Sequence, residues 1–298
     1  MMYHEPVLLN ECIEGLDINP KGIYVDLTFG SGGHSSEILK RLTEGKLIAF
    51  DQDSDSAINV LNDKRFIFIN QNFRFFRNFL KLNKFEKVDG ILADLGVSSH
   101  QIDSPKRGFS FRHDAELDMR MDNRAKISAK VLLNTYNFEN LVKIFSLYGE
   151  ITNSKQVANA VIKYRENAPL KTTGNLIEAI EPYAPKFSEY KFYAKVFQAI
   201  RIAVNEEIDV LKEMLLQTAL TLKPNGRLVI LSYHSLEDRL VKNYIKSGDF
   251  EGKQDKDMYG NTSEPFEAVN RKLIIPSEEE IERNNRARSA KLRIAQKR

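Results

Sequence analysis

The sequence predicts an α/β protein in which a doubly wound parallel sheet is interrupted by an inserted helical domain. Over about the first 100 residues, strand-like and helix-like segments alternate, which is typical of a parallel sheet with helices on both faces. From about residue 106 to 205 helical patterns dominate. A strand pattern returns at 227–231, after the turn 223–226. Because four strands alone make a thin open sheet, we expect this late strand to join them.

The elements follow from the spacing of apolar residues and from turn residues. We predict strands at 22–27, 46–50, 65–69 and 88–93, separated by helices at 35–42, 54–61 and 73–82. Helices are expected at 129–136, 139–148 and 154–165, and a long one at 205–222. The predicted organisation is therefore a first part of the sheet domain at 1–105, a helical insertion at 106–204, and a second part at 205–298 with a basic C-terminal tail.

Composition excludes several classes of protein. The chain has 298 residues, 42% of them hydrophobic, and a net charge of +3, which does not by itself indicate nucleic-acid binding. One cysteine, Cys12, can form neither an intrachain disulfide nor a structural zinc site, so no metal is expected. The N-terminal segment lacks the pattern of a signal peptide, and no apolar run has the length of a membrane span. We expect a soluble, cytoplasmic protein without a membrane partner.

A glycine-rich loop between the first strand and helix is the strongest local motif. Gly30, Gly32 and Gly33 allow positive φ and close approach to a ligand, and the following helix offers unpaired N–H groups. A dinucleotide-binding fingerprint would place a third glycine where this chain has Ser35. The motif lacks a Walker lysine, which disfavours a nucleoside triphosphate. A glycine turn alone is as often a simple chain reversal as a ligand site.

Two carboxylates at the ends of strands favour a ligand site. Asp51 ends the second strand, 21 residues after Gly30, where an acidic residue accepts hydrogen bonds from ribose hydroxyls. Asp94 ends the fourth strand, and the carboxyl ends of parallel strands form one crevice. These features predict an adenosine-type cofactor, either NAD or S-adenosylmethionine.

Eight motifs distributed over nearly the whole chain resemble the bacterial 16S rRNA (cytosine-N4)-methyltransferase family, of the MraW or RsmH type. They are HEPVL at 4–8, TFGSGGHS at 28–35, DLGVSS at 94–99, RGFSF at 107–111, LDMRMD at 117–122, FQAIRIAVN at 197–205, HSLEDR at 234–239 and RARSAKLR at 286–293.

The resemblance implies a Rossmann-like methyltransferase sheet, S-adenosylmethionine as the cofactor, and N4 of a decoding-centre cytidine in the 16S rRNA of the small ribosomal subunit as the acceptor. By motif match, it places cofactor contacts on Gly32, Gly33, His34, Asp51, Phe73, Asp94 and Gln101. Phe73 would suit an adenine ring, although its spacing alone favours core packing with Phe75, Phe76 and Phe79.

A cytosine amine is a weak nucleophile, because its lone pair is delocalised into the ring. The site must therefore hold the amine with hydrogen-bond acceptors and eventually remove a proton from it. The hypothesis is that Asp94, or a group beside it, accepts from N4, while Tyr233 or His234 shapes the pocket for an unstacked base. A structural hydrogen bond explains His234 equally well.

Two basic segments are candidates for RNA contact. Arg107, Phe109, Phe111 and Arg120 mix cations with aromatic rings, as base-stacking surfaces do. Arg288, Lys291 and Arg293 belong to the basic C-terminal run, which can bind phosphates. A solvated charged surface is the alternative for either segment, and the resemblance favours RNA.

Three alternatives remain beside this interpretation. A nicotinamide-dependent oxidoreductase is disfavoured by Ser35 at the third glycine position. A non-catalytic rRNA-binding assembly factor would not need the set of Gly32, Asp51 and Asp94. A DNA amino-methyltransferase typically carries a Pro-Pro-aromatic motif where this chain has 94–97, so DNA is not an expected partner. The sequence leaves open whether two copies form a homodimer.

Overall fold

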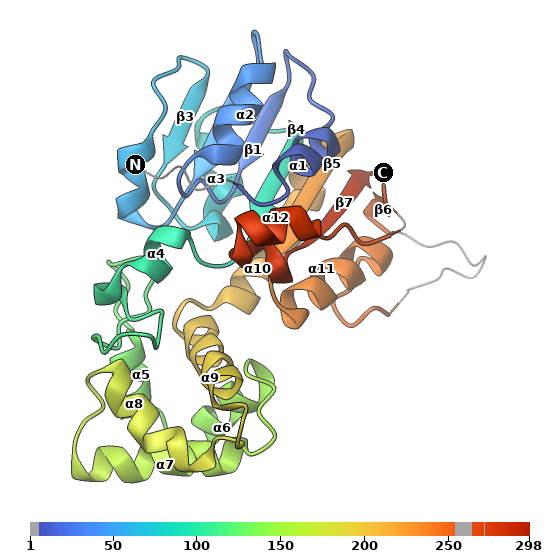
Figure 1. The fold of residues 1–298 in the computed structure, drawn as a ribbon. Helices are drawn as coiled ribbons and strands as arrows, with labels where there is room; N and C mark the ends of the chain where they lie inside the picture. Colours follow the sequence, from blue (N-terminus) through green and yellow to red (C-terminus); the bar gives the residue numbers. More distant parts are fainter. Residues whose placement is uncertain (1–5, 254–263, 271) are drawn as a thin grey trace. The chain divides into compact units, whose positions relative to one another are not determined.

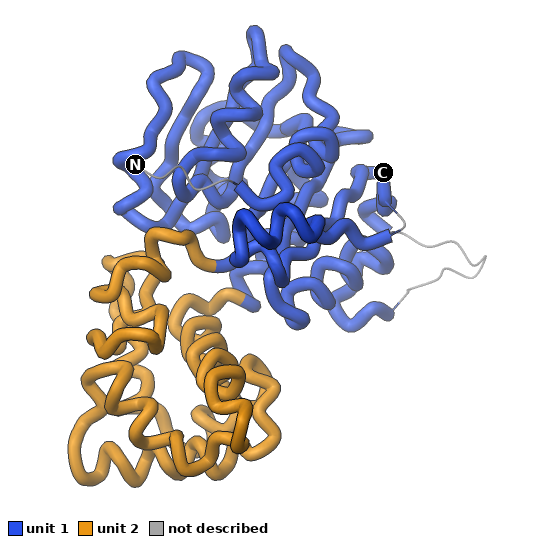
Figure 2. The backbone as a smooth tube through the Cα atoms, viewed as in Figure 1, with its two compact units in different colours: residues 1–96, 208–298 blue, residues 97–207 orange. Residues whose placement is uncertain are grey.

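The computed structural model describes residues 6–253, 264–270 and 272–298, so His4 and Glu5 of the first motif lie outside it. The chain forms two compact units, residues 1–96 with 208–298, and residues 97–207 (Figure 2). The second unit is a helical insertion between two parts of a sheet domain, but its ends differ from the predicted 106 and 204. The chain leaves the sheet domain shortly after its fourth strand. The sequence does not show this point, because the absence of a strand pattern is also typical of loops within a sheet domain.

The first unit is built on a seven-stranded mixed sheet with the order β3-β2-β1-β4-β5-β7-β6 (Figure 1). Its strands are β1 (Ile23–Asp26), β2 (Lys46–Phe50), β3 (Phe66–Ile69), β4 (Val88–Asp94), β5 (Leu222–Ser232), β6 (Phe266–Ala268) and β7 (Lys291–Lys297). The first five are parallel, and β7 and β6 are antiparallel to their neighbours. The direction of winding reverses between β1 and β4, which is where open α/β sheets bind ligands.

Helices cover both faces of this sheet, which confirms the predicted doubly wound fold (Figure 1). One face packs against α3 (Phe76–Leu82), α10 (Glu207–Thr221) and α11 (Ser235–Ser247). The other packs against α1 (Leu9–Leu16) and α2 (Gly33–Arg41). Along β5, Leu228 and Ile230 face the first core while Val229 and Leu231 face the second. This alternation explains why the buried strands are continuous apolar runs in the sequence.

The C-terminal basic run is not a tail, and that expectation was wrong. Residues Lys291–Lys297 form β7, which pairs with β5 on one side and with β6 on the other. Leu292, Ile294 and Ala295 are buried between the charged positions. The run therefore has the period-two pattern of a strand, which its high charge hides. Two short helices, α12 (Glu278–Arg283) and η5 (Asn285–Ser289), precede it.

The second unit is a helical bundle with its own hydrophobic core. Its helices are α4 (Ser99–Asp103), η3 (Pro105–Arg107), α5 (Ala129–Thr135), α6 (Phe138–Leu147), α7 (Ser154–Asn167), α8 (Thr173–Ile180), η4 (Glu181–Tyr183) and α9 (Glu189–Val204). The helices predicted around 129, 139 and 154 are confirmed as α5, α6 and α7.

Two helix predictions need correction. The segment predicted as a helix at 54–61 forms only the 3-10 helix η1 (Ser54–Asn59), capped by the Asp53 side chain. The helix predicted at 205–222 begins at Glu207, because Glu206 adopts φ +52° and separates α10 from α9. The predicted helix at 73–82 starts as η2 (Phe73–Phe75) and continues as α3. Within the described parts of the chain, no helix is both long and apolar enough to cross a membrane.

Candidate active site

The glycine loop follows β1 at the carboxyl edge of the sheet, and its conformation requires glycine at two positions. Gly30 and Gly32 have φ of +53° and +80°, a region that other residues rarely occupy. The Gly30 N–H donates to Asp51 Oδ2 at 2.7 Å, and the Asn59 side chain donates to the Gly30 carbonyl at 3.1 Å. A β-carbon on Gly33 would lie 2.3 Å from the Pro6 ring. The loop is thus fixed from both sides.

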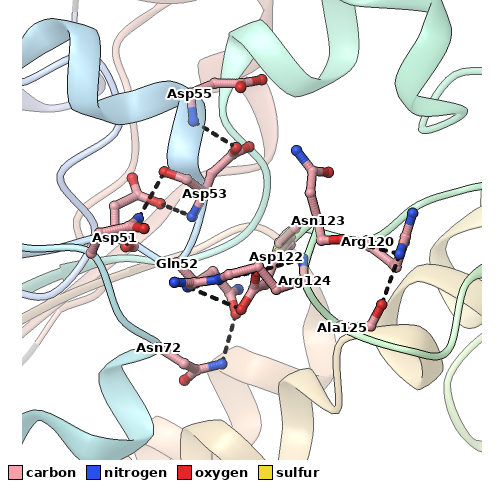
Figure 3. Close-up of polar contacts among 12 residues, drawn as sticks. Asp51, Gln52, Asp53, Asp55, Asn72, Arg120, Asp122, Asn123, Arg124 and Ala125 are labelled. Carbon is pink, nitrogen blue, oxygen red and sulfur yellow. Dashed lines mark hydrogen bonds and ion pairs between the residues drawn. The ribbon is translucent and has the colours of Figure 1, made fainter.

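Asp51 fixes this loop and retains acceptor capacity. Its Oδ2 accepts from Gly30. Its Oδ1 accepts from the Asp53 N–H at 2.8 Å (Figure 3). Each carboxylate oxygen has two lone pairs, so one lone pair on each remains for a ligand hydroxyl. Burial raises the pKa of Asp51 to about 6. The neighbouring Asn72 side chain donates to Gln52 Oε1 at 2.7 Å and orders the next turn (Figure 3).

Ser35, which stands at the third glycine position of a dinucleotide motif, forms a buried hydrogen bond that stabilises the fold. Its hydroxyl donates to Asp26 Oδ2 at 2.6 Å, and the Thr28 N–H donates to Asp26 Oδ1 at 3.0 Å. Asp26 and Ser35 are both fully buried. Burial raises the pKa of Asp26, and the bond from Ser35 opposes this effect. The departure from the dinucleotide motif therefore supplies a donor to a buried carboxyl group.

We expect Ser35→Ala to lower the free energy of unfolding by about 1–3 kcal/mol, because it removes a donor from a buried carboxyl. Thermal or urea unfolding of the purified protein measures this change. Ser36→Ala is the matched control, since the Ser36 hydroxyl donates to the Gly32 carbonyl one turn earlier on a half-buried helix surface. Equal stability of the two variants would contradict the role given to Ser35.

Asp94, at the end of β4, connects the glycine loop with the segment after β5. Its backbone N–H donates to Thr28 Oγ1 at 2.6 Å, and the Tyr233 hydroxyl donates to its Oδ1 at 2.7 Å. Burial, followed by the Asp94 charge, raises the pKa of Tyr233 well above its usual value. Tyr233 therefore remains a hydrogen-bond donor at neutral pH and orients the Asp94 carboxylate.

His34 lies on the other side of Asp94. Its Nδ1 is 3.8 Å from Asp94 Oδ2, and its Nε2 is 3.2 Å from the Val7 carbonyl oxygen. Because a carbonyl only accepts, Nε2 carries the proton. Burial lowers the pKa of His34, so the neutral ring turns its Nδ1 lone pair toward Asp94.

His234 forms a structural hydrogen bond, which is one of the two roles that the sequence suggested for it. It is the N-cap of α11, and its ring accepts from the Glu237 N–H. Its Nε2 lies 3.2 Å from Glu237 Oε1, although the angle is not that of a hydrogen bond. Glu237 Oε2 also accepts from the Tyr233 N–H at 3.1 Å, so this buried carboxylate fixes the turn that carries Tyr233.

The other expected cofactor residues lie in different places. Phe73 opens η2 and packs, partly buried, against the core beneath α3, in agreement with the simpler interpretation of its ring. Gln101 belongs to the helical unit, where it is buried in α4. Its side chain accepts from the Ser98 N–H at 3.1 Å and completes a capping box.

The cation–aromatic segment of the helical unit serves mostly that unit's own structure. Arg107 is only 7% exposed, and its guanidinium donates to the carbonyls of Arg120 and Met121. Arg120 forms a two-bond ion pair with Asp118. It also donates to the Ala125 carbonyl (Figure 3). These donors are engaged internally, so they differ from the solvent-facing contacts that the sequence led us to expect.

The two aromatic residues of this segment are partly buried as well. Phe111 packs against Phe197, with ring centroids 5.3 Å apart, and Phe109 lies under the Arg107 guanidinium at 5.8 Å. Both rings border the helical core. They leave only part of their surface for a stacked base.

Of the basic C-terminal residues, Arg293 and Lys291 form ion pairs with Asp238, whereas Arg288 forms none with any residue that the structure describes. Arg293 Nε donates to Asp238 Oδ1 at 2.7 Å, whereas Lys291 Nζ is 3.7 Å from Asp238 Oδ2. Arg288 is exposed, and none of the described residues forms an ion pair with it. These residues come from η5 and β7, so folded elements present them rather than a tail.

Sequence reasoning missed the residues that support the site. Thr28 bonds Asp94, Val7 holds His34, and Glu237 holds Tyr233. Thr28, Val7 and Glu237 occur inside the motifs that carry the family resemblance. Nothing in their spacing along the chain indicates which partner each one meets.

This chain is similar to known proteins over its whole length. A family model described as the MraW methylase family matches residues 1–298. Ribosomal RNA small subunit methyltransferase H of Cytophaga hutchinsonii is 56% identical over 298 residues, covering 99% of this chain and 100% of the relative. Proteins of the same name from Christiangramia forsetii and Bacteroides thetaiotaomicron are 56% and 54% identical, each covering 100% of this chain and 98% of the relative.

Proposed function

Because this chain belongs to the MraW methylase family, we propose that it methylates 16S rRNA of the small ribosomal subunit, using S-adenosylmethionine as methyl donor. The acceptor in this proposal is the exocyclic N4 of a decoding-centre cytidine. The family membership makes the chain a methyltransferase, and the identity of its relatives supports the small-subunit RNA as substrate. Such an enzyme works in the cytoplasm, where small subunits are assembled.

The residues around the glycine loop fit this donor. The two remaining lone pairs of Asp51 suit the adjacent hydroxyls of a ribose. The positive-φ glycines leave the backbone open to a polar ligand tail, and a β-carbon on Gly30 would meet no atom within 4 Å. When bound, S-adenosylmethionine supplies an electrophilic methyl group. The use of Ser35 as a donor to Asp26 argues against the alternative of a nicotinamide cofactor.

The observation that carries the proposed chemistry is the position of Asp94. It ends β4 beside the glycine loop, and Tyr233 and His34 approach its carboxylate from two sides. A carboxylate here can accept a hydrogen bond from the N4 amine, drawing its lone pair out of the ring and toward the methyl group. Tyr233 acts on the carboxylate and is therefore a positioning residue. The same carboxylate would take the amine proton as the amine receives the methyl group, while the donor's sulfur would keep the electron pair of the broken S–CH3 bond.

Methylation of undermethylated small subunits tests the proposal. The full-length protein is incubated with these subunits and with S-adenosylmethionine labelled in its methyl group. We expect label in 16S rRNA, at one cytidine, as N4-methylcytidine after digestion. Label in other RNA, on another base, or in no RNA would overturn the proposed acceptor.

The raised pKa of Asp51 leads to a pH dependence of donor binding. Ribose hydroxyls donate to the ionised carboxylate, so binding requires loss of the proton that the free protein holds below pH 6. We expect the dissociation constant of S-adenosylmethionine to rise by up to about tenfold per pH unit as the pH falls below 6. Calorimetric titration between pH 5 and 7.5 measures this.

Two variants control this measurement. Asp51→Asn should bind the donor more weakly and show little pH dependence, because the amide does not titrate. Asp55→Asn changes an exposed carboxylate four positions on and should keep the wild-type profile. A flat wild-type profile over this range would rule out Asp51 as the titrating acceptor.

A further inference from the structure

A pocket of about 290 Å³ lies beside β5 and β7 in the sheet domain. One wall is apolar, from Ile275, Pro276 and Ile281, and another carries the cations Arg288 and Lys291. None of the residues that line it is acidic. The volume is at the lower end of small-ligand sites, about 300–1,000 Å³. An apolar surface facing two cations suits a ligand with a flat or sugar-like body and a phosphate.

The pocket shares a residue with the candidate active site. Tyr233 lines it, and the hydroxyl of the same residue donates to Asp94 Oδ1 at 2.7 Å. Lys291 pairs in register with Ser232, the last residue of β5, so both lie at the carboxyl edge of the parallel strands. Along this edge the glycine loop follows β1, Asp94 ends β4, and the pocket lies where β5 ends and the antiparallel β7 begins. The donor residues and the pocket are thus on opposite sides of Asp94.

The charges and the apolar wall of the pocket are available to a ligand. Arg288 is exposed and forms no ion pair with any described residue. Lys291 forms an ion pair of 3.7 Å with Asp238, which is also bonded to Arg293 at 2.7 Å, so the Lys291 ammonium keeps N–H donors for a ligand. Ile275 is 63% exposed, which is unusual for an isoleucine and leaves apolar surface for a ligand to cover.

We propose that this pocket binds the acceptor nucleotide of the RNA, with Arg288 and Lys291 on its flanking phosphates and Ile275 and Ile281 against its nucleoside. The proposal rests on the proposed function, since it assigns the RNA side of the same reaction. The two cations bind the phosphates of the RNA backbone irrespective of base sequence. Tyr233 lies between this pocket and Asp94, which accepts from the reacting amine. Two cations can bind the phosphates of an unstacked nucleotide, and an apolar wall can cover its nucleoside.

The double variant Arg288→Ala/Lys291→Ala tests the pocket. With undermethylated small subunits as substrate, we expect KM for the subunit to rise about tenfold or more, because two phosphate contacts are lost. The slope of log affinity against log salt should become shallower by up to about two. The dissociation constant of S-adenosylmethionine should remain that of the wild type. Arg288→Lys/Lys291→Arg should restore most of the affinity, since it keeps both charges.

Lys21→Ala/Lys64→Ala is the matched control, because it removes two exposed lysines that precede β1 and β3 at the opposite edge of the sheet. It should leave KM unchanged. Ile275→Asp provides an independent test: the side chain is exposed, so the fold should tolerate it, and the added negative charge should raise KM for the subunit.

The two levels of the proposal fail in different ways. If the wild-type protein methylates small subunits but the Arg288/Lys291 double variant keeps the wild-type KM and salt slope, the pocket assignment is wrong and the proposed function stands. If the wild type labels no small-subunit RNA, the proposed function fails irrespective of the pocket.

Discussion

Asp94→Asn is expected to lower the turnover of methyl transfer by about 100-fold or more, a larger effect than any change in the affinity for S-adenosylmethionine. The amide keeps the size of the side chain but replaces one acceptor oxygen with a donor and cannot take a proton, and positioned acid–base groups contribute about 10²–10⁴-fold. Single-turnover methylation of small subunits, with donor affinity measured separately, gives both quantities. Wild-type turnover in this variant would remove Asp94 from the mechanism.

Two further variants test whether the loss of turnover is specific to the Asp94 carboxylate. Asp89→Asn changes a carboxylate near the opposite end of the same strand, where it accepts from Lys223 and from the Ile23 N–H. It should keep wild-type turnover. Tyr233→Phe retains the ring and removes the hydroxyl that donates to Asp94, so turnover should fall less than in Asp94→Asn. A loss in Tyr233→Phe that Asp94→Asn does not share would assign the hydroxyl a role of its own.

Deletion of residues 283–298 is expected to abolish folding of the sheet domain rather than merely weaken RNA binding. It removes β7, and with it the pairing of β5 and β6 to that strand. Loss of the buried Leu292 and Ile294 alone would cost about 2–5 kcal/mol each, against a typical total stability of about 5–15 kcal/mol. Circular dichroism and thermal unfolding of the truncated protein test this expectation.

The Arg288/Lys291 double variant is the control for this deletion, because it removes two of the same charges and keeps the strand. It should melt close to the wild type. A truncated protein with the wild-type melting temperature would show that the run is dispensable for the fold, as a tail would be.

Features that depend on local chemistry could be predicted from the amino-acid sequence. Buried strands are continuous apolar runs, and the turn at the end of β1 needs glycine at Gly30 and Gly32 for its positive φ. Asp51 and Asp94 could be placed at one edge because the carboxyl ends of parallel strands always lie on the same side of a sheet. The motifs then indicated the family, which the comparisons confirm.

Which charges remain available to a ligand depends on tertiary contacts that no sequence pattern reveals. In the sequence, Arg107 and Arg288 look alike, yet the first is buried against backbone carbonyls and the second is exposed beside a pocket. The basic run became a strand because β5 offers it a partner more than fifty residues earlier in the chain. Pairing between distant segments carries no local signal, since its free energy comes from burial and hydrogen bonds that exist only after folding. The same holds for Tyr233, whose bond to Asp94 gives the site its geometry.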